Sequence, residues 1–101
     1  MEKKSKSGYV IVYCPEHKHS KTKNGWIFEH RIVIENFINQ GLKIGQCIHH
    51  IDLNKTNNKI ENLMIFNSNK EHSSWHNKLK RHGLTNPMKR FLENRWKEYE
   101  N

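Results

Sequence analysis

The hydrophobic positions near the start of the chain fall in two short runs that predict strands. Residues 9–13 are β-branched or aromatic, and residues 26–28 form a second apolar run. Residues of these types favour strands, and the turn dipeptide Asn24-Gly25 before the second run is typical of a hairpin. The sequence therefore predicts a long-looped β-hairpin, preceded by a flexible polar lead over residues 1–7.

Two further segments show the period of a helix. Apolar residues recur at helical spacing from residue 32 to 38, which predicts a helix over residues 29–40 that ends at Gly41. A second helix is predicted over residues 86–99, opened by Asn86-Pro87. Its apolar side consists of Met88, Phe91, Leu92, Trp96 and Tyr99.

Between these helices the pattern predicts strand, loop, strand and helix. Residues 47–51 and 63–66 are short apolar runs, and the connection between them is rich in Asn, Lys and Asp. Ser68 and Glu71 form a capping-box pattern that starts a helix. That helix, with Trp75 on its apolar side, is expected to run to Gly83. Trp75 and Trp96 both fall on apolar sides, so we expect them in the core.

Histidines at both ends of this segment provide the strongest candidate chemistry. His49 and His50 are adjacent in a predicted strand, so their side chains point to opposite sides. His72 and His76 lie four residues apart in the predicted helix and share one face. This arrangement suits a metal bound by the helix pair and one strand histidine. The other strand histidine is then free to act as the general base of a hydrolase.

Composition limits the class of protein. The chain has 101 residues, of which 34% are hydrophobic, and its mean hydropathy is −1.01. These values predict one domain, residues 1–101, with a thin core that a metal would reinforce. Lys and Arg outnumber Asp and Glu by 18 to 10, which gives a net charge of +8. This excess favours nucleic acid as a partner, although charge alone is equally compatible with a merely soluble basic protein.

The two cysteines and the apolar runs exclude several other classes. Cys14 and Cys47 lie far apart, which excludes a four-cysteine zinc knuckle and disfavours a disulfide scaffold. The first residues lack the apolar segment of a secretory signal, and no run approaches the length needed to span a membrane. We therefore expect an intracellular protein, in the cytoplasm of a bacterial or phage-infected cell, without membrane partners.

Residues 47–77, CIHHIDLNKTNNKIENLMIFNSNKEHSSWHN, carry a resemblance to a known family. They resemble the motif of the HNH endonucleases, the ββα-metal nucleases. The upstream segments GYVIVYCPEHKH and NGWIFEHRIVIENFI are similar to compact phage and bacterial members, so the resemblance covers residues 8–77. It implies an α+β fold with a ββα-metal core over residues 47–82, together with the N-terminal hairpin and helix and the C-terminal helix.

The resemblance also implies a role for each motif residue. His49 matches a metal ligand and His50 matches the general base. Asn62 matches the middle asparagine, which ties the loop down and helps to hold the base. His72 matches a further metal ligand, and His76 matches the additional ligand of members with His-x-x-x-His on the helix.

The identity of the metal stays open at the level of sequence. Many relatives have Asp at the position of His49 and Asn at the position of His72, and those relatives favour magnesium. Imidazole suits softer ions better than it suits magnesium. We therefore expect one divalent ion and leave manganese, magnesium, zinc and nickel open.

The function implied by the resemblance is a metal-dependent DNA endonuclease that nicks DNA or cuts both strands. The chain is too short for a separate recognition domain, so low sequence specificity is expected, or specificity supplied by a homodimer or a larger phage or host complex. The alternative is a non-catalytic nucleic-acid-binding module with a structural metal. Structural zinc sites have four protein ligands, and three good ones are found here, which favours catalysis.

Other polar residues have weaker assignments. Glu29-His30-Arg31 serves the active site or packs the hairpin, and Asp52, Asn57 and Asn58 are expected to shape the loop. In the basic loop, His17 and His19 contact phosphate, bind a second metal with Cys14, or are simply exposed. Basic residues form a DNA track or a solvated helix face; the candidates for nucleic-acid binding are Arg31, Lys78, Arg81, Lys89 and Arg90.

Overall fold

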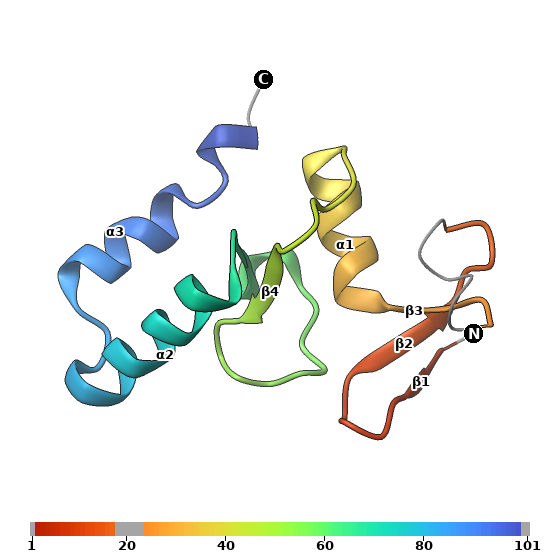
Figure 1. The fold of residues 1–101 in the computed structure, drawn as a ribbon, viewed down its shortest axis with the longest axis horizontal. Coiled ribbons are helices and arrows are strands. Elements are labelled where there is room, and N and C mark those ends of the chain that lie inside the picture. Colours follow the sequence, from red (N-terminus) through yellow and green to blue (C-terminus); the bar gives the residue numbers. More distant parts are fainter. Residues whose placement is uncertain (1, 18–23, 100–101) are drawn as a thin grey trace.

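A computed structural model of the chain describes residues 2–17 and 24–99. In these residues the chain is an α+β domain with three α-helices and two small antiparallel sheets (Figure 1). The strands are β1 (Glu2–Lys4), β2 (Val10–Tyr13), β3 (Trp26–Phe28), β4 (Cys47–His50) and β5 (Leu63–Phe66). The helices are α1 (Glu29–Ile38), α2 (Asn69–His82) and α3 (Asn86–Asn94), with 3₁₀ turns η2 (Ile60–Asn62) and η3 (Lys97–Tyr99).

The N-terminal sheet has the strand order β1-β2-β3. The antiparallel pairing of β2 with β3 confirms the predicted hairpin. The prediction of a flexible lead is wrong for residues 2–4, which form β1 on the edge of β2. These residues have no apolar pattern, but the open edge of β2 offers backbone groups that an added strand satisfies. Lys3 also places its Nζ 4.2 Å from the centre of the Trp26 ring.

Helix α1 follows β3 directly and ends earlier than the sequence predicts. Its last residue is Ile38, and Asn39 adopts the left-handed conformation with φ 58° and donates its N–H to the carbonyl of Glu35. Asn tolerates this conformation better than most residues. Asn39, rather than Gly41, therefore terminates the helix.

The second sheet is the hairpin of β4 and β5, with a register that pairs Cys47 with Phe66 and His50 with Leu63. Helix α2 begins just after this hairpin, as predicted. The Ser68 hydroxyl accepts from the N–H of Glu71 at 3.2 Å. The Glu71 carboxylate accepts from the N–H of Asn67 at 2.9 Å, one residue before the position that the capping box predicts.

The C-terminal segment differs from the single helix predicted over residues 86–99. Helix α3 ends at Asn94 and the short turn η3 follows. The Arg95 guanidinium explains this break, because it donates to the carbonyls of Glu61, Leu63 and Leu92 at 2.5 to 2.9 Å. This anchoring holds the chain against the second sheet.

The β4–β5 hairpin separates two groups of core side chains, because alternate residues of a strand face opposite sides. One group lies towards α2 and α3 and consists of Met64, Phe66, Trp75 and Met88. The other contains Ile34, Ile38 and Leu63, against which Trp96 and Tyr99 pack. Trp75 is therefore in the core, as predicted, and the half-buried Trp96 packs against the second group. The predicted apolar side of the last segment is divided: Met88 and Leu92 lie with the first group, Trp96 and Tyr99 with the second, and Phe91 is 48% exposed. Among the residues described, every helix is too short or too polar to cross a bilayer.

Candidate metal centre

Strand β4 directs its two histidines to opposite faces of the hairpin. His49 faces α2, where its ring lies 4.7 Å from the ring of His76. His50 faces the N-terminal part, where its ring lies 5.1 Å from that of His30. Both are buried, with 3% and 6% of their surface exposed. The predicted alternation of the strand is therefore confirmed.

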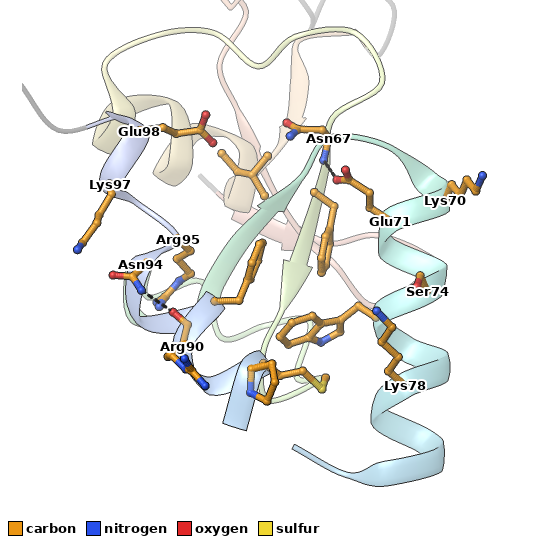
Figure 2. A pocket seen from close by; sticks show the side chains of 16 residues that line it. Asn67, Lys70, Glu71, Ser74, Lys78, Arg90, Asn94, Arg95, Lys97 and Glu98 are labelled. Atoms are coloured by element: carbon orange, nitrogen blue, oxygen red, sulfur yellow. Dashed lines mark hydrogen bonds between the residues drawn. The ribbon is translucent and has the colours of Figure 1, made fainter. Parts of the chain in front are cut away.

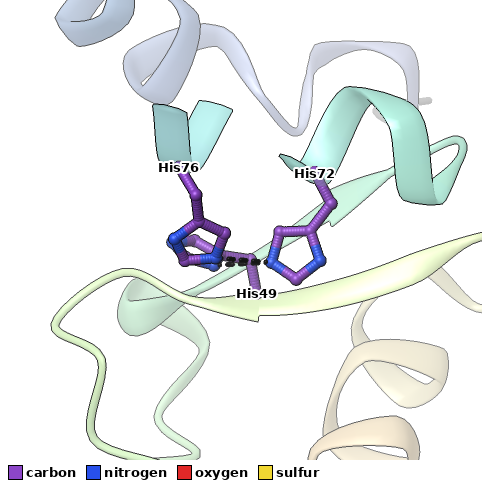
Figure 3. A group of neighbouring side chains, drawn as sticks. All are labelled: His49, His72 and His76. Atoms are coloured by element: carbon purple, nitrogen blue, oxygen red, sulfur yellow. Dashed lines mark hydrogen bonds between the residues drawn. The ribbon is translucent and has the colours of Figure 1, made fainter. Parts of the chain in front are cut away.

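His49, His72 and His76 bring one ring nitrogen each to a common point (Figure 3). These nitrogens all lie within 4.8 Å of one another. Nε2 of His72 lies 3.1 Å from Nδ1 of His49 and 2.9 Å from Nε2 of His76. His72 and His76 reach down from α2 while His49 rises from β4, so the hairpin and the helix together build this histidine cluster.

The arrangement of the nitrogens fits a metal ion better than hydrogen bonds alone. Each ring nitrogen carries either one proton or one lone pair, so Nε2 of His72 cannot bond well to both neighbours. Adjacent nitrogen ligands on tetrahedral zinc lie about 3.3 Å apart, close to the observed separations. The cluster can therefore hold a metal ion.

Burial favours the neutral, metal-binding form of two members of the cluster, His49 and His72. Burial, with a further contribution from the neighbouring imidazoles, lowers the pKa of His49 from 6.5 to about 4. Burial and His76 also lower the pKa of His72. Neutral imidazole is the metal-binding form. At neutral pH these two rings are therefore neutral, and each has one nitrogen with a lone pair that a metal ion can bind.

The lowered pKa of His49 predicts that the metal-free protein loses stability as the pH falls from about 6.5 towards 4. In this window the unfolded chain binds a proton that the folded chain excludes. The stabilising contribution is complete above the unfolded pKa and is lost as the pH falls through the window. We expect Tm, measured with a chelator present, to fall by about 10 °C or more from this group. A His49→Gln variant should show a shallower pH dependence, and an identical slope would contradict the assignment.

An aromatic ring supports the cluster from the core side. Phe66 of β5 stacks on His72 with ring centres 5.2 Å apart and planes 18° from parallel. It also meets the ring of His49 edge-on at 5.8 Å. Because Phe66 is itself buried against Trp75, it limits the movement of two of the three candidate ligands.

His50 lies outside the cluster and is held by residues that sequence reasoning did not assign to the site. Its Nε2 lies 2.7 Å from Oδ1 of Asn58, and Nδ2 of Asn58 donates to the Glu29 carboxylate at 2.8 Å. Asn58 was expected only to shape the loop, and no spacing in the sequence connects residue 29 with residue 58. Glu29 is therefore connected to His50 through Asn58, while His30 packs directly against the His50 ring.

Asn62 holds together the loop that joins β4 to β5, by bonding to other residues of that loop. Its side chain donates to the Asp52 carboxylate and the Asn57 carbonyl, and accepts from the N–H of Asp52, all at 2.8 to 2.9 Å. Asn57 also donates to Asp52 at 2.8 Å. These bonds agree with the expected tether. The side chain that bonds to His50, however, is Asn58 and not Asn62.

The candidate residues for nucleic-acid binding are not gathered at the histidine cluster. Lys78 and Arg90 line an open groove of about 960 Å³ between α2 and α3, with Phe66, Trp75, Met88 and Phe91 among its apolar lining (Figure 2). Lys78 and Arg81 line an adjoining hollow on α2. Lys89 is exposed on α3. Arg31 instead lies 3.3 Å from Glu35 in an ion pair within α1.

The proposed second metal site has no support in the described part of the chain. His17 pairs with Glu35 at 2.6 Å, and Cys14 is a free thiol. His19 lies outside the described residues. Within those residues, His49, His72 and His76 are the one group with the geometry of a metal site.

Comparisons with protein-family profiles, with curated proteins and with solved structures gave no significant match. The family resemblance noted in the sequence therefore remains a prediction. What this protein does has to be inferred from the geometry and chemistry of its own residues.

Proposed function

We propose that this protein is a metal-dependent DNA endonuclease of the HNH type, with a ββα-metal core formed by β4, β5 and α2. One observation carries the proposal. Three histidines of a hairpin and the following helix form a group that could hold a metal ion, while His50, the neighbour of His49 in the chain, stays outside the cluster and is held by a hydrogen bond to Asn58. A metal beside an unligated, oriented imidazole is what hydrolysis of a phosphodiester requires.

The openness of the histidine cluster favours catalysis over a structural metal. Three protein ligands leave coordination positions for water and phosphate, whereas structural zinc is enclosed by four. His49 is buried, His72 is half-buried and His76 is exposed, so the cluster opens towards solvent beside α2. A substrate phosphate can reach an ion at this position.

The proposed reaction assigns a separate task to each group. An ion held by His49, His72 and His76 would neutralise the charge that develops on the phosphate and on the departing oxygen. His50 takes a proton from the attacking water as the new P–O bond forms and the bond to the 3′ oxygen breaks. Asn62 keeps the loop between the strands in place, so that His50 is presented in a fixed position.

DNA is the proposed partner, because the net charge of +8 favours a polyanion. Contacts to phosphate carry no sequence information. We therefore expect low sequence specificity from such contacts, unless a second copy or a larger phage or host complex supplies it. The rival function is a nucleic-acid-binding module in which the histidines hold a structural metal.

The test is cleavage of supercoiled plasmid by the purified protein. We expect nicked or linear product with at least one of Mn²⁺, Mg²⁺, Zn²⁺ and Ni²⁺, and none with a chelator. A linear product that forms without a nicked intermediate would show that both strands are cut together. Binding of DNA without cleavage in any of these ions would support the rival function instead.

A further inference from the structure

The hydrogen bonds around His50 form a chain with one possible direction. A carboxylate only accepts hydrogen bonds, so the Asn58 atom that faces Glu29 has to be the amide Nδ2. The other end of the same amide, the carbonyl Oδ1, then faces Nε2 of His50 at 2.7 Å. Since Oδ1 also only accepts, Nε2 of His50 has to carry the proton. The Glu29 carboxylate thus determines the protonation of a ring that it does not touch.

The consequence for the imidazole is a defined tautomer. In a neutral imidazole one nitrogen carries the proton and the other carries the lone pair. With the proton on Nε2, the lone pair lies on Nδ1, which makes no hydrogen bond to any described residue. Nδ1 is therefore the nitrogen that can accept a proton from water.

The placement of both partners favours a fixed orientation. Asn58 is buried, with 9% of its surface exposed, so water cannot easily replace Glu29 as its hydrogen-bond partner. Glu29 is the first residue of α1, so the helix fixes its backbone at this position. The imidazole also packs edge-on against His30.

We propose that Glu29 and Asn58 are positioning residues, which fix His50 as the Nε2–H tautomer and so direct the lone pair of Nδ1 to the attacking water. The acid–base part of this inference rests on the proposed nuclease function. The tautomer of His50 does not depend on that function, and it can be measured even if the protein cleaves no DNA.

The test compares Glu29→Gln with Glu29→Asp in the full chain. Gln fills almost the same space as Glu but both donates and accepts, so it permits the Asn58 amide to turn and His50 to take the proton on Nδ1. Asp is shorter but keeps the acceptor-only carboxylate. We expect Glu29→Gln to lower the cleavage rate by tenfold or more, and Glu29→Asp to restore part of that loss. A role in packing alone predicts the reverse order.

The decisive readout is the ¹⁵N chemical shifts of the His50 ring, recorded at about pH 8, where free imidazole is neutral. The parent protein should show the proton on Nε2, and Glu29→Gln and Asn58→Ala should show a mixture of tautomers. Asn57→Ala is the matched control, because Asn57 belongs to the same loop but bonds to Asp52 and not to His50. It should keep the parent tautomer.

Two results would overturn the inference. One is a parent protein with the proton on Nδ1 of His50, and the other is a Glu29→Gln variant with unchanged tautomer and unchanged rate. If the parent protein cleaves no DNA but shows the Nε2–H tautomer that Glu29→Gln disturbs, the nuclease function fails while the positioning role of Glu29 and Asn58 stands.

Discussion

Replacing His50 by Ala is expected to lower the rate of plasmid cleavage by at least a hundredfold while the protein stays folded and still binds metal. A positioned general base contributes about 10²–10⁴ to the rate of such reactions. His50 is not one of the clustered nitrogens, so its loss leaves the three candidate ligands in place. The measurement is the initial rate of loss of supercoiled plasmid at saturating metal.

The matched control is His82→Ala, which removes an exposed histidine at the end of α2 without touching the cluster or the loop. It should cleave like the parent protein. The increase in Tm that metal produces should be the same in the parent, in His82→Ala and in His50→Ala. A His50→Ala variant that binds metal and cuts at the parent rate would show that another group takes the proton.

Removing either helix histidine of the cluster should abolish both metal-dependent stabilisation and cleavage. A ligand that binds only the folded state, at a hundred times its Kd, stabilises it by about 2.7 kcal/mol. For a domain of this size that corresponds to an increase in Tm of about 10 °C or more. We expect this increase in the parent protein with Zn²⁺ or Mn²⁺, and little or none in His72→Ala or His76→Ala.

The two helix variants should differ in how far they lower the Tm of the metal-free protein. His72 stacks on Phe66 and is half-buried, so His72→Ala should also lower the Tm of the metal-free protein. His76 is exposed, and its replacement should leave that Tm close to the parent value. A chelator that leaves the parent Tm unchanged, together with His72→Ala and His76→Ala proteins that still cleave, would contradict a metal site at these residues.

Local pattern was enough to predict most elements of the fold. The strand over residues 63–66 and the helix from Ser68 to Gly83 agree with the structure, because apolar period and capping residues act within a few positions. The errors lie where distant parts of the chain decide the outcome. Arg95 ends α3 by bonding to the carbonyls of Leu63 in β5 and Glu61 in η2, and β1 exists because β2 offers an open edge.

The same distinction applies to the site. The i, i+4 spacing of His72 and His76 and the alternation of His49 and His50 follow from helix and strand geometry, so sequence suffices to group the candidate ligands. The contact of Asn58 with Glu29 joins residues that are 29 positions apart in the chain. No regular spacing of residues predicts this contact, because it depends on how α1 packs beside the loop.

The separation of the two sheets has a consequence for engineering this chain. No backbone ladder joins β1–β3 to β4–β5 among the described residues, so no strand register aligns the two halves. Side-chain packing sets their relative position instead: Ile34 and Ile38 of α1 lie in one core group with Leu63 of β5, and Glu29 bonds to Asn58. Replacing Ile34 by the smaller Val would therefore leave every strand pair and the histidine cluster in place, while it loosens α1 and with it the contact of Glu29 with Asn58. The packing of α1 is thus a means of changing turnover separately from metal binding, without altering a residue that contacts His50 or the histidine cluster.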